Sequence, residues 1–445
     1  MSAKGTKIVG GLAALLIVAV LGVYLIHAEG QEPRIEVQPA DGSHVRGEAN
    51  ASITVTDRPS GLAEIEVRAI QEGEELIILE LEPEEAPVTL SRTIAFEEMQ
   101  LQEGDFDLQV SARDHSWANF FQGNRATLEM SYTYDDTPPR IDMESFRHNM
   151  QRGGSAAAAF RLEEKVSRTG VKVGERFFPA YEQDSGIHLA FFSYPHDIKA
   201  GSELPTVVAV DLAGNSREVP LRANVRETSF SSSEVRISEG FLERIMPQYR
   251  DDFPEVSGKA ELFVAVNEEL RRQNREELVR LGRETVTRPL WSERFLRLPG
   301  GSRQSGFGDK RSYLVKGEHR TSSVHTGIDL AATARAPIPA SNSGRVVHAG
   351  WLGIYGETVV IDHGLGLQSL YGHMSQIDVR PGQQVERGEV IGRTGSTGLA
   401  GGDHLHFEIL VSGVPVNPVE WWDSKWIENN IEPKLEAAGQ EVKAE

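Results

Sequence analysis

The chain has 445 residues, no cysteine, and 66 acidic against 46 basic side chains, which gives a formal net charge of −20. The absence of cysteine excludes disulfide bonds, cysteine-ligated metal sites and thiol nucleophiles. The acidic balance disfavours a nucleic-acid binder, because such a protein needs cationic surface to neutralise phosphates. A chain of this length predicts about two to four domains.

The first thirty residues predict a membrane anchor. Lys4 and Lys7 precede an uncharged run of 19 residues, Ile8–Ile26. As a helix this run matches the hydrocarbon core of a bilayer, which is roughly 30 Å thick. The charge ahead of the run predicts that residues 1–28 form a cytoplasmic tip and a transmembrane helix, with the rest of the chain in the periplasm or outside. We therefore expect a single-pass inner-membrane protein of the cell envelope. A signal peptide cleaved after Ala28 is the alternative.

The next two hundred residues carry a net charge of −17 and predict β structure. Ala51–Thr56, for example, alternates apolar and polar residues with period two, as half-buried strands do. Adjacent prolines at positions 138 and 139 mark a boundary, because proline breaks both helix and central strand. We expect two immunoglobulin-like β-sandwich modules, and a single irregular β domain is the alternative. The expected modules are residues 29–136 and 137–228.

Residues 229–290 change character and predict a helical linker. The stretch Lys259–Arg283 lacks proline and is rich in Glu, Leu and Arg. Within it Leu262, Val266 and Leu270 recur at helical spacing. We interpret the segment as a solvated helix that spaces two domains, because two heptads are too few to indicate a coiled coil.

Residues 291–425 are neutral overall and hold 7 of the 13 histidines and 21 of the 43 glycines. A short acidic tail, 426–445, follows them. The concentration of histidine in one neutral segment indicates that the chemistry of the protein lies there.

Three segments of this domain supply candidate metal ligands. His404 and His406 lie two residues apart in a β-prone run, so on a strand both side chains point to one face. Burying both imidazoles is costly unless a metal ion binds one of them. His325 and Asp329 form a second pair, and His373 is a further candidate. Two histidines and one aspartate suit Zn²⁺ and leave its fourth position open, as in catalytic zinc sites. The remaining histidines are then available for acid–base work.

Taken together and in this order, these segments resemble the lysostaphin-type (LytM-type) zinc metallopeptidases, a family of peptidoglycan endopeptidases. The likeness extends from near Gly306 to Trp422, and it implies a compact antiparallel β domain with an open groove. The matching stretches are His325–Leu330, Val359–Gly364, Leu370–Met374, Val379–Val385, Gly392–Gly398, His404–Glu408 and Asn417–Pro418.

The resemblance also implies a role for each candidate residue. His325, Asp329 and His406 correspond to the ligands of one Zn²⁺ per catalytic domain, and His373 and His404 correspond to the catalytic pair. Which of these two accepts a proton from water and which stabilises the oxyanion stays open. Glu408, on the same strand face as His406, is either an orienting partner of the ligand or an exposed strand carboxylate.

We therefore expect a mainly β protein with an N-terminal transmembrane helix, two β-sandwich modules, a helical linker and a C-terminal metallopeptidase domain. The expected function is that of a membrane-anchored, exported zinc metallo-endopeptidase, which hydrolyses peptide bonds in bacterial peptidoglycan by means of a metal-activated water. The alternative is a non-catalytic or autoinhibited domain that binds and regulates another cell-wall hydrolase. The β modules are candidates for contacts with cell-wall or division proteins, and no nucleic-acid partner is expected.

Overall fold

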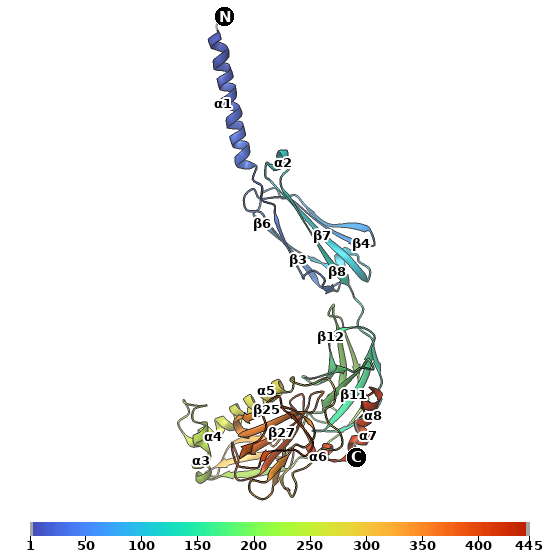
Figure 1. Cartoon of the computed structure of the whole chain (residues 1–445), viewed down its shortest axis with the longest axis vertical. Coiled ribbons are helices and arrows are strands. Elements are labelled where there is room, and N and C mark those ends of the chain that lie inside the picture. The colour runs from blue at the N-terminus through green and yellow to red at the C-terminus, as the bar shows by residue number, and fades with distance from the viewer. Residues whose placement is uncertain (1–2, 442–445) are drawn as a thin grey trace. The chain divides into compact units, whose positions relative to one another are not determined.

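The computed structural model describes the backbone of residues 3–441 and the side chains of residues 15–441. The chain divides into two compact units (Figure 1). Unit 1 comprises Met1–Pro138 and Val210–Ser216, and unit 2 comprises Pro139–Ala209 and Arg217–Glu445. The structure is mainly strand, as the sequence predicts.

The prediction of a transmembrane helix at the N-terminus is wrong. The segment does form a helix, α1 (Ala3–His27). A membrane span needs about 20 consecutive, predominantly apolar residues. In the described part of the chain, no helix has both the length and the apolar character for such a span. The side chains of residues 8–14, where the predicted run begins, lie outside the described residues.

Unit 1 contains two sheets around one apolar core. Its strands are β1 (Arg34–Gln38), β2 (His44–Val45), β3 (Asn50–Thr56), β4 (Leu62–Gln71), β5 (Glu74–Leu81), β6 (Thr89–Ala95), β7 (Gly104–Asp114) and β8 (Arg125–Tyr134), with the short helices η1 (Phe96–Met99) and α2 (Ala118–Phe121). The sheet orders are β1-β3-β6 and β2-β8-β7-β4-β5. The predicted alternation in β3 buries Ala51, Ile53 and Val55 in a core shared with the second sheet.

Unit 2 begins with a pair of four-stranded sheets, in the orders β14-β15-β11-β9 and β13-β12-β16-β17, and a two-stranded pair, β10-β18. These strands are β9 (Ile141–Met143), β10 (His148–Gln151), β11 (Ser155–Leu162), β12 (Val166–Val173), β13 (Arg176–Pro179), β14 (Tyr181–Glu182), β15 (Ile187–Ser193), β16 (Thr206–Asp211), β17 (Ser216–Pro220) and β18 (Ala223–Arg226). Apart from the end of β16 and the first residue of β17, which fall in unit 1, they belong to the same compact unit as the C-terminal domain.

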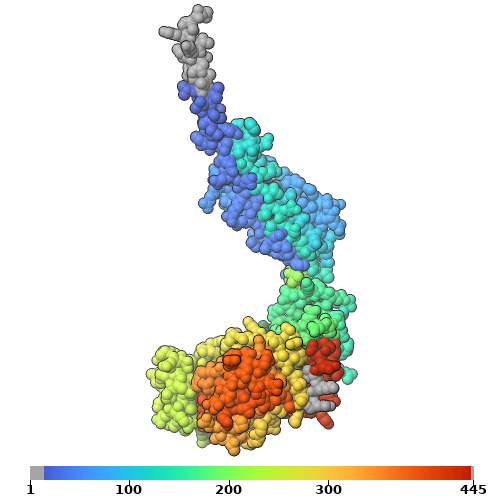
Figure 2. All heavy atoms as spheres, in the orientation of Figure 1, coloured from blue at the N-terminus to red at the C-terminus, as the bar shows by residue number. Residues whose placement is uncertain are grey.

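The segment after these strands is helical, but it is not a solvated spacer. Its helices are α3 (Glu239–Ile245), η2 (Met246–Tyr249), α4 (Lys259–Ala265), the π-helical turn η3 (Val266–Leu270) and α5 (Arg271–Leu281). Leu262 and Leu278 are buried in one cluster with Val360, Leu370 and Leu410 of the large C-terminal sheet. The apolar spacing seen in the sequence therefore marks a face that covers this sheet. Figure 2 shows this segment, in yellow-green, beside the orange C-terminal domain.

The C-terminal domain is built on an eight-stranded sheet whose main path is β20-β23-β31-β27-β26-β25-β29, with β32 paired to β31. Smaller sheets, β19-β21-β22 and β24-β30-β28, complete it. The strands are β19 (Ser232–Ile237), β20 (Ser302–Ser305), β21 (Lys310–Val315), β22 (Glu318–Val324), β23 (Ile328–Ala331), β24 (Pro337–Pro339), β25 (Gly344–Trp351), β26 (Glu357–Asp362), β27 (Leu367–Met374), β28 (Gln376–Ile377), β29 (Gln384–Val385), β30 (Val390–Arg393), β31 (Leu405–Val411) and β32 (Val414–Val416), with the short helix η4 (Gly353–Tyr355).

The chain ends in three short helices, α6 (Pro418–Trp422), α7 (Ser424–Asn430) and α8 (Glu432–Ala437). The described part of the predicted acidic tail therefore forms α7 and α8. Ile427, Ile431 and Leu435 are fully buried there, and α8 contacts β11 and β15. The acidic residues of this segment surround an apolar stripe that the composition alone does not reveal.

A buried carboxylate joins α6 to β11. The backbone N–H and the hydroxyl of Ser155 donate to Glu420 Oε2 at 2.9 Å and 3.1 Å, and Gln151 Nε2 donates to Oε1 at 3.3 Å. None of these partners carries a positive charge. Burial therefore raises the pKa of Glu420 to about 7, and the hydrogen bonds offset this only in part.

We predict that Glu420 makes the stability of unit 2 dependent on pH. Because its pKa is raised in the folded state, the stabilisation is complete below about pH 4.5 and is lost as the pH rises to about 7. The loss is about 3 kcal/mol. Urea unfolding, followed by tryptophan fluorescence, should show wild type losing this amount between pH 4.5 and 8 relative to Glu420→Gln. The exposed control Glu428→Gln should follow wild type, and parallel pH profiles for wild type and Glu420→Gln would refute the prediction.

Candidate metal centre

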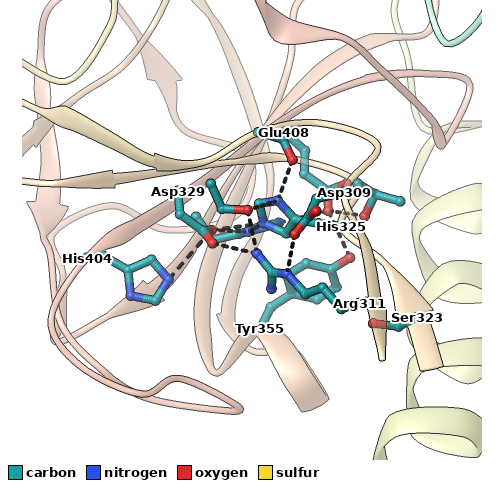
Figure 3. Close-up of polar contacts among 12 residues, drawn as sticks. Asp309, Arg311, Ser323, His325, Asp329, Tyr355, His404 and Glu408 are labelled. Atoms are coloured by element: carbon teal, nitrogen blue, oxygen red, sulfur yellow. Dashed lines mark hydrogen bonds and ion pairs between the residues drawn. The ribbon is translucent and has the colours of Figure 1, made fainter. Parts of the chain in front are cut away.

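The structure brings together the three residues predicted as metal ligands. β23 and β31 are antiparallel neighbours in which Asp329 lies opposite His406. His325 stands three residues before β23. One ligand atom from each of the three side chains lies within 4.8 Å of the others. Figure 3 shows His325 and Asp329 converging from this part of the sheet.

The two histidines of this group each turn one ring nitrogen toward Asp329. His325 Nε2 and His406 Nδ1 each lie 2.9 Å from Asp329 Oδ1 and 3.0 Å from one another. The other nitrogen of each ring already donates a proton: His325 Nδ1 to Gly306 O at 2.9 Å, and His406 Nε2 to Glu408 Oε1 at 2.9 Å. In the neutral form that binds a metal, each ring has a single N–H. Because carbonyl and carboxylate oxygens only accept hydrogen bonds, these two contacts place it on His325 Nδ1 and His406 Nε2 and leave the lone pairs on the facing nitrogens. Three electron-pair donors thus meet at one point, an arrangement that a cation stabilises.

The donor set fits a zinc ion. Two imidazole nitrogens and one carboxylate oxygen are typical ligands, and in a tetrahedral site they stand about 3.3 Å apart. The observed separations of 2.9 to 3.0 Å are close to this value. All three side chains also line a cavity of about 600 Å³, so a fourth ligand can enter from that side.

Glu408 is a buried orienting partner of His406, not an exposed strand carboxylate. Arg275 from α5 contacts it with two hydrogen bonds, of 2.7 and 3.0 Å. Thr326 and Tyr355 donate their hydroxyls to Oε1 at 2.8 and 3.0 Å. Burial by itself raises the pKa of Glu408, but the charge of Arg275 and the hydrogen bond from His406 outweigh burial and bring it to about 2. The carboxylate therefore stays ionised and holds the proton of His406 on Nε2.

Gly327 makes room for a ligand. A Cβ atom on this residue would lie 2.7 Å from His406 Cε1 and 2.6 Å from the carbonyl oxygen of Phe407. The backbone of Gly327 does not have a positive φ, so the requirement is for space and not for an unusual conformation. Glycine at this position lets the chain that carries His325 approach β31 closely.

His373 and His404, the predicted catalytic pair, lie beside the candidate ligands. The ring centroids of His373 and His404 are 4.8 Å apart, and that of His373 is 5.7 Å from that of His406. His404 Nε2 lies 3.6 Å from Asp329 Oδ1, as Figure 3 shows. All five residues proposed from the sequence therefore face one cavity.

A bulge directs His373 into this cavity. The register between β26 and β27 shifts between Glu357 and Val359, so β27 contains one extra residue there. His373 has φ +63°, a left-handed conformation that is uncommon outside glycine and often occurs at functional sites. Its Nδ1 donates to Thr397 O at 2.8 Å. Burial lowers the pKa of His373 well below its ordinary value, so the ring is neutral with its lone pair on Nε2.

Several residues of the site escaped the sequence reasoning. Arg311 Nη2 donates to Asp329 Oδ2 at 3.0 Å and to Ser305 Oγ at 2.8 Å. Arg275 binds Glu408, and its guanidinium lies 5.3 Å from the ring centroid of Tyr355. Arginine is common throughout this chain, and nothing in its local sequence marks these two. Only the folding of α5 and β21 against the sheet brings them to the metal centre.

Comparison with known proteins agrees with this geometry. Residues 323–418 match the family described as peptidase family M23. The DD-carboxypeptidase/endopeptidase Mpg of Neisseria meningitidis is 47% identical over 96 residues, which are 22% of each chain. The peptidoglycan DD-endopeptidase ShyA of Vibrio cholerae is 37% identical over 129 residues, or 28% of this chain and 29% of that protein. The catalytic domain of lysostaphin from Staphylococcus simulans is 28% identical, with 28% of this chain and 94% of that chain covered and a TM-score of 0.24.

The chain therefore contains a peptidase M23 domain of the lysostaphin (LytM) type, and the resemblance drawn from the sequence motifs is confirmed. The domain has peptidoglycan endopeptidases among its homologues. The chain spans about a quarter of the length of the curated relatives it matches.

We predict that Gly327→Ala weakens zinc binding by about tenfold or more, because the added methyl group displaces the ring of His406. Competition with a chromophoric chelator measures the affinity. Gly240→Ala is the matched control, since a Cβ at that position meets no atom within 4 Å. Equal zinc affinity in the two variants would contradict the close-approach argument.

We predict that Glu408→Gln lowers zinc affinity about 10- to 100-fold, as removal of a ligand's hydrogen-bonding partner generally does. The amide cannot hold the proton on His406 Nε2 by its charge, and Arg275 loses its ionic partner. Isothermal titration with zinc measures the change. The exposed substitution Glu318→Gln should leave the affinity at the wild-type value, and an unchanged affinity in Glu408→Gln would show that the ligand needs no such support.

Proposed function

We propose that the chain is a zinc metallo-endopeptidase that hydrolyses peptide bonds in bacterial peptidoglycan and acts in the cell envelope. The observation that carries this proposal is the convergence of three potential ligand atoms, His325 Nε2, Asp329 Oδ1 and His406 Nδ1. The names of the relatives supply the substrate class, because two of them are peptidoglycan DD-endopeptidases of Vibrio cholerae. The envelope is the compartment in which this substrate lies.

The five residues divide the chemistry between them. Zinc held by His325, Asp329 and His406 would supply Lewis-acid activation of a water molecule and of the scissile carbonyl. His373 and His404 would move the protons. The Nδ1 atom of each donates to a backbone carbonyl, of Thr397 and of Gly402, both at 2.8 Å. In the neutral tautomer with its proton on Nδ1, each ring can accept a proton on Nε2, and Nε2 of His404 also lies 3.6 Å from Asp329 Oδ1.

The cycle needs both of these imidazoles. One Nε2 would accept the proton of the attacking water and then return it to the leaving amine, and the other ring, when protonated on Nε2, would hydrogen-bond the oxygen of the tetrahedral species. Since the two rings lie 4.8 Å apart between centroids, both can serve one scissile bond. The buried location of His373 favours its neutral form, which suits a base.

The test is digestion of purified peptidoglycan by the full chain supplied with zinc. Wild type should release new amino groups, and His406→Ala should release none because it lacks a ligand. His348→Ala is the matched control, since the ring of His348 hydrogen-bonds the backbone oxygen of Gly350 at 3.2 Å and lies outside the cavity. Zinc bound at one equivalent with no amine released from several wall types would contradict the enzymatic proposal and favour a domain that binds another hydrolase.

We further predict that His373→Ala and His404→Ala separate binding from catalysis. Each variant should retain one equivalent of zinc while the turnover rate falls about 10²- to 10⁴-fold, the usual contribution of a positioned acid or base. Metal content by mass spectrometry and amine release on the same preparation give both quantities. Loss of zinc in either variant would assign that histidine to the ligands instead.

A further inference from the structure

The cavity beside the metal centre is lined by an excess of positive charge. Its charged lining residues other than histidine are four arginines and one carboxylate, Asp329, which is also a candidate metal ligand. The arginines are Arg236, Arg244, Arg271 and Arg311. In a chain with a net charge of −20, such a local reversal of sign indicates that the cavity receives an anionic group.

Arg271 and Arg244 have no acidic partner among the described residues, and of the two only Arg271 is shielded from solvent; Arg244 is exposed and donates to Gly401 O. Arg311 is paired with Asp329, and Arg236 with Glu234. Within residues 15–441, no carboxylate lies at ion-pair distance from Arg271, whose hydrogen bonds go only to Asn267. Burial lowers the pKa of Arg271, Tyr313 and the Glu408 carboxylate raise it in part, and the nearby guanidiniums of Arg275 and Arg311 lower it again. An anion placed against this guanidinium would relieve that repulsion.

The side chain of Arg271 is held in place before any ligand arrives. Asn267 is 1% exposed, and its Oδ1 accepts a hydrogen bond from Arg271 Nη2 at 2.9 Å. Asn267 Nδ2 in turn donates to Thr321 Oγ1 at 3.0 Å and to Ser322 O at 3.1 Å. Nε and Nη2 of Arg271 are thus occupied by Asn267, and the described contacts leave Nη1 available for a ligand.

The backbone at this point is also irregular. Asn267 lies in the π-helical turn η3, which ends one residue before Arg271. Single π-helical turns are uncommon and frequently occur at functional sites. Here the turn belongs to the helix that carries both the anchoring amide and the guanidinium, and Arg271 lines the cavity together with His325 and His406.

We propose that Arg271, anchored by Asn267 and assisted by Arg311, is a specificity-determining residue that binds a free carboxylate of the peptide substrate close to the scissile bond. The guanidinium fork matches a carboxylate in geometry and charge. This inference rests on the proposed peptidase function and adds the chemical class of substrate that the cavity selects. The carboxylate can come from the C-terminus of a peptide or from an acidic side chain.

Peptide binding to the full chain tests the proposal without requiring turnover. We would measure dissociation constants calorimetrically in a His404→Ala background, so that no peptide is consumed. The probes are acetyl-lysyl-D-alanyl-D-alanine as the free acid, the same peptide as its C-terminal amide, and acetyl-glutamyl-D-alanyl-D-alanine amide. Each is measured with Arg271→Gln, Arg271→Lys and the control Arg272→Gln, whose residue lies on the same helix but outside the cavity and pairs with Glu269.

The proposal expects at least one acid-bearing peptide to bind about tenfold more tightly than the lysyl amide. Preference for the free acid identifies a terminal carboxylate, and preference for the glutamyl amide identifies a side-chain carboxylate. Arg271→Gln should remove the preference, Arg271→Lys should retain part of it, and Arg272→Gln should keep it whole. Two results would overturn the proposal. One is that the His404→Ala protein with arginine at position 271 binds all three peptides with equal affinity. The other is that Arg271→Gln leaves the preference unchanged.

These outcomes are independent of the peptidase test. If the chain binds acidic peptides through Arg271 but digests no peptidoglycan, the carboxylate subsite is supported and the proposed function is refuted. If the chain digests peptidoglycan but has no preference for acid-bearing peptides, the proposed function is supported and the subsite is refuted. Thermal unfolding of each variant shows whether a loss of binding reflects a loss of folded protein.

Discussion

The ion pair between Glu408 and Arg275 supports much of the site. Glu408 lies on β31 next to the candidate ligand His406, and Arg275 lies on α5, more than one hundred residues earlier in the chain. Their two hydrogen bonds keep a fully buried carboxylate ionised. Because the ionised carboxylate fixes the proton of His406, the bare nitrogen of the ring faces Asp329. The helical segment that covers the sheet is therefore part of the metal centre as well as of the core.

Two local departures from regular strand geometry complete the arrangement. The absence of a side chain at Gly327 lets the chain carrying His325 come close to the ring of His406. The bulge in β27 turns His373 to the same side as His404. Neither feature contributes to the apolar core, and His373 holds a left-handed conformation that costs free energy. Such exceptions to regular structure are expected where a side chain has to be placed for chemistry.

The sequence predicted the strand-rich fold because that follows from local patterns, whereas the grouping of the five histidine and aspartate residues came from the resemblance to the lysostaphin-type family. Alternation in Ala51–Thr56 indicates a strand, and the spacing of His404 and His406 indicates a shared face. The partners of these residues could not be predicted, because Arg271, Arg275 and Arg311 reach the site only through tertiary packing. The same limit explains the helical segment, which was interpreted from its sequence as a solvated spacer, because apolar spacing does not reveal the sheet that the helices pack against.

The transmembrane prediction failed for a different reason. It rested on the length of Ile8–Ile26 and its absence of charge, whereas in the described part of the chain no helix is long and apolar enough for a span. For the acidic tail, net charge hid an apolar stripe, Ile427, Ile431 and Leu435, that packs against the β-sandwich part of unit 2. Charge alone is thus a weak guide to which segments of this chain are buried.

The most direct test of the account is a crystal structure of the full chain grown with zinc, with anomalous data collected on both sides of the zinc absorption edge. The account predicts one strong anomalous peak about 2.0 to 2.2 Å from His325 Nε2, from an oxygen of Asp329 and from His406 Nδ1. A peak bound through the other ring nitrogens, or no peak between these three side chains, would contradict it.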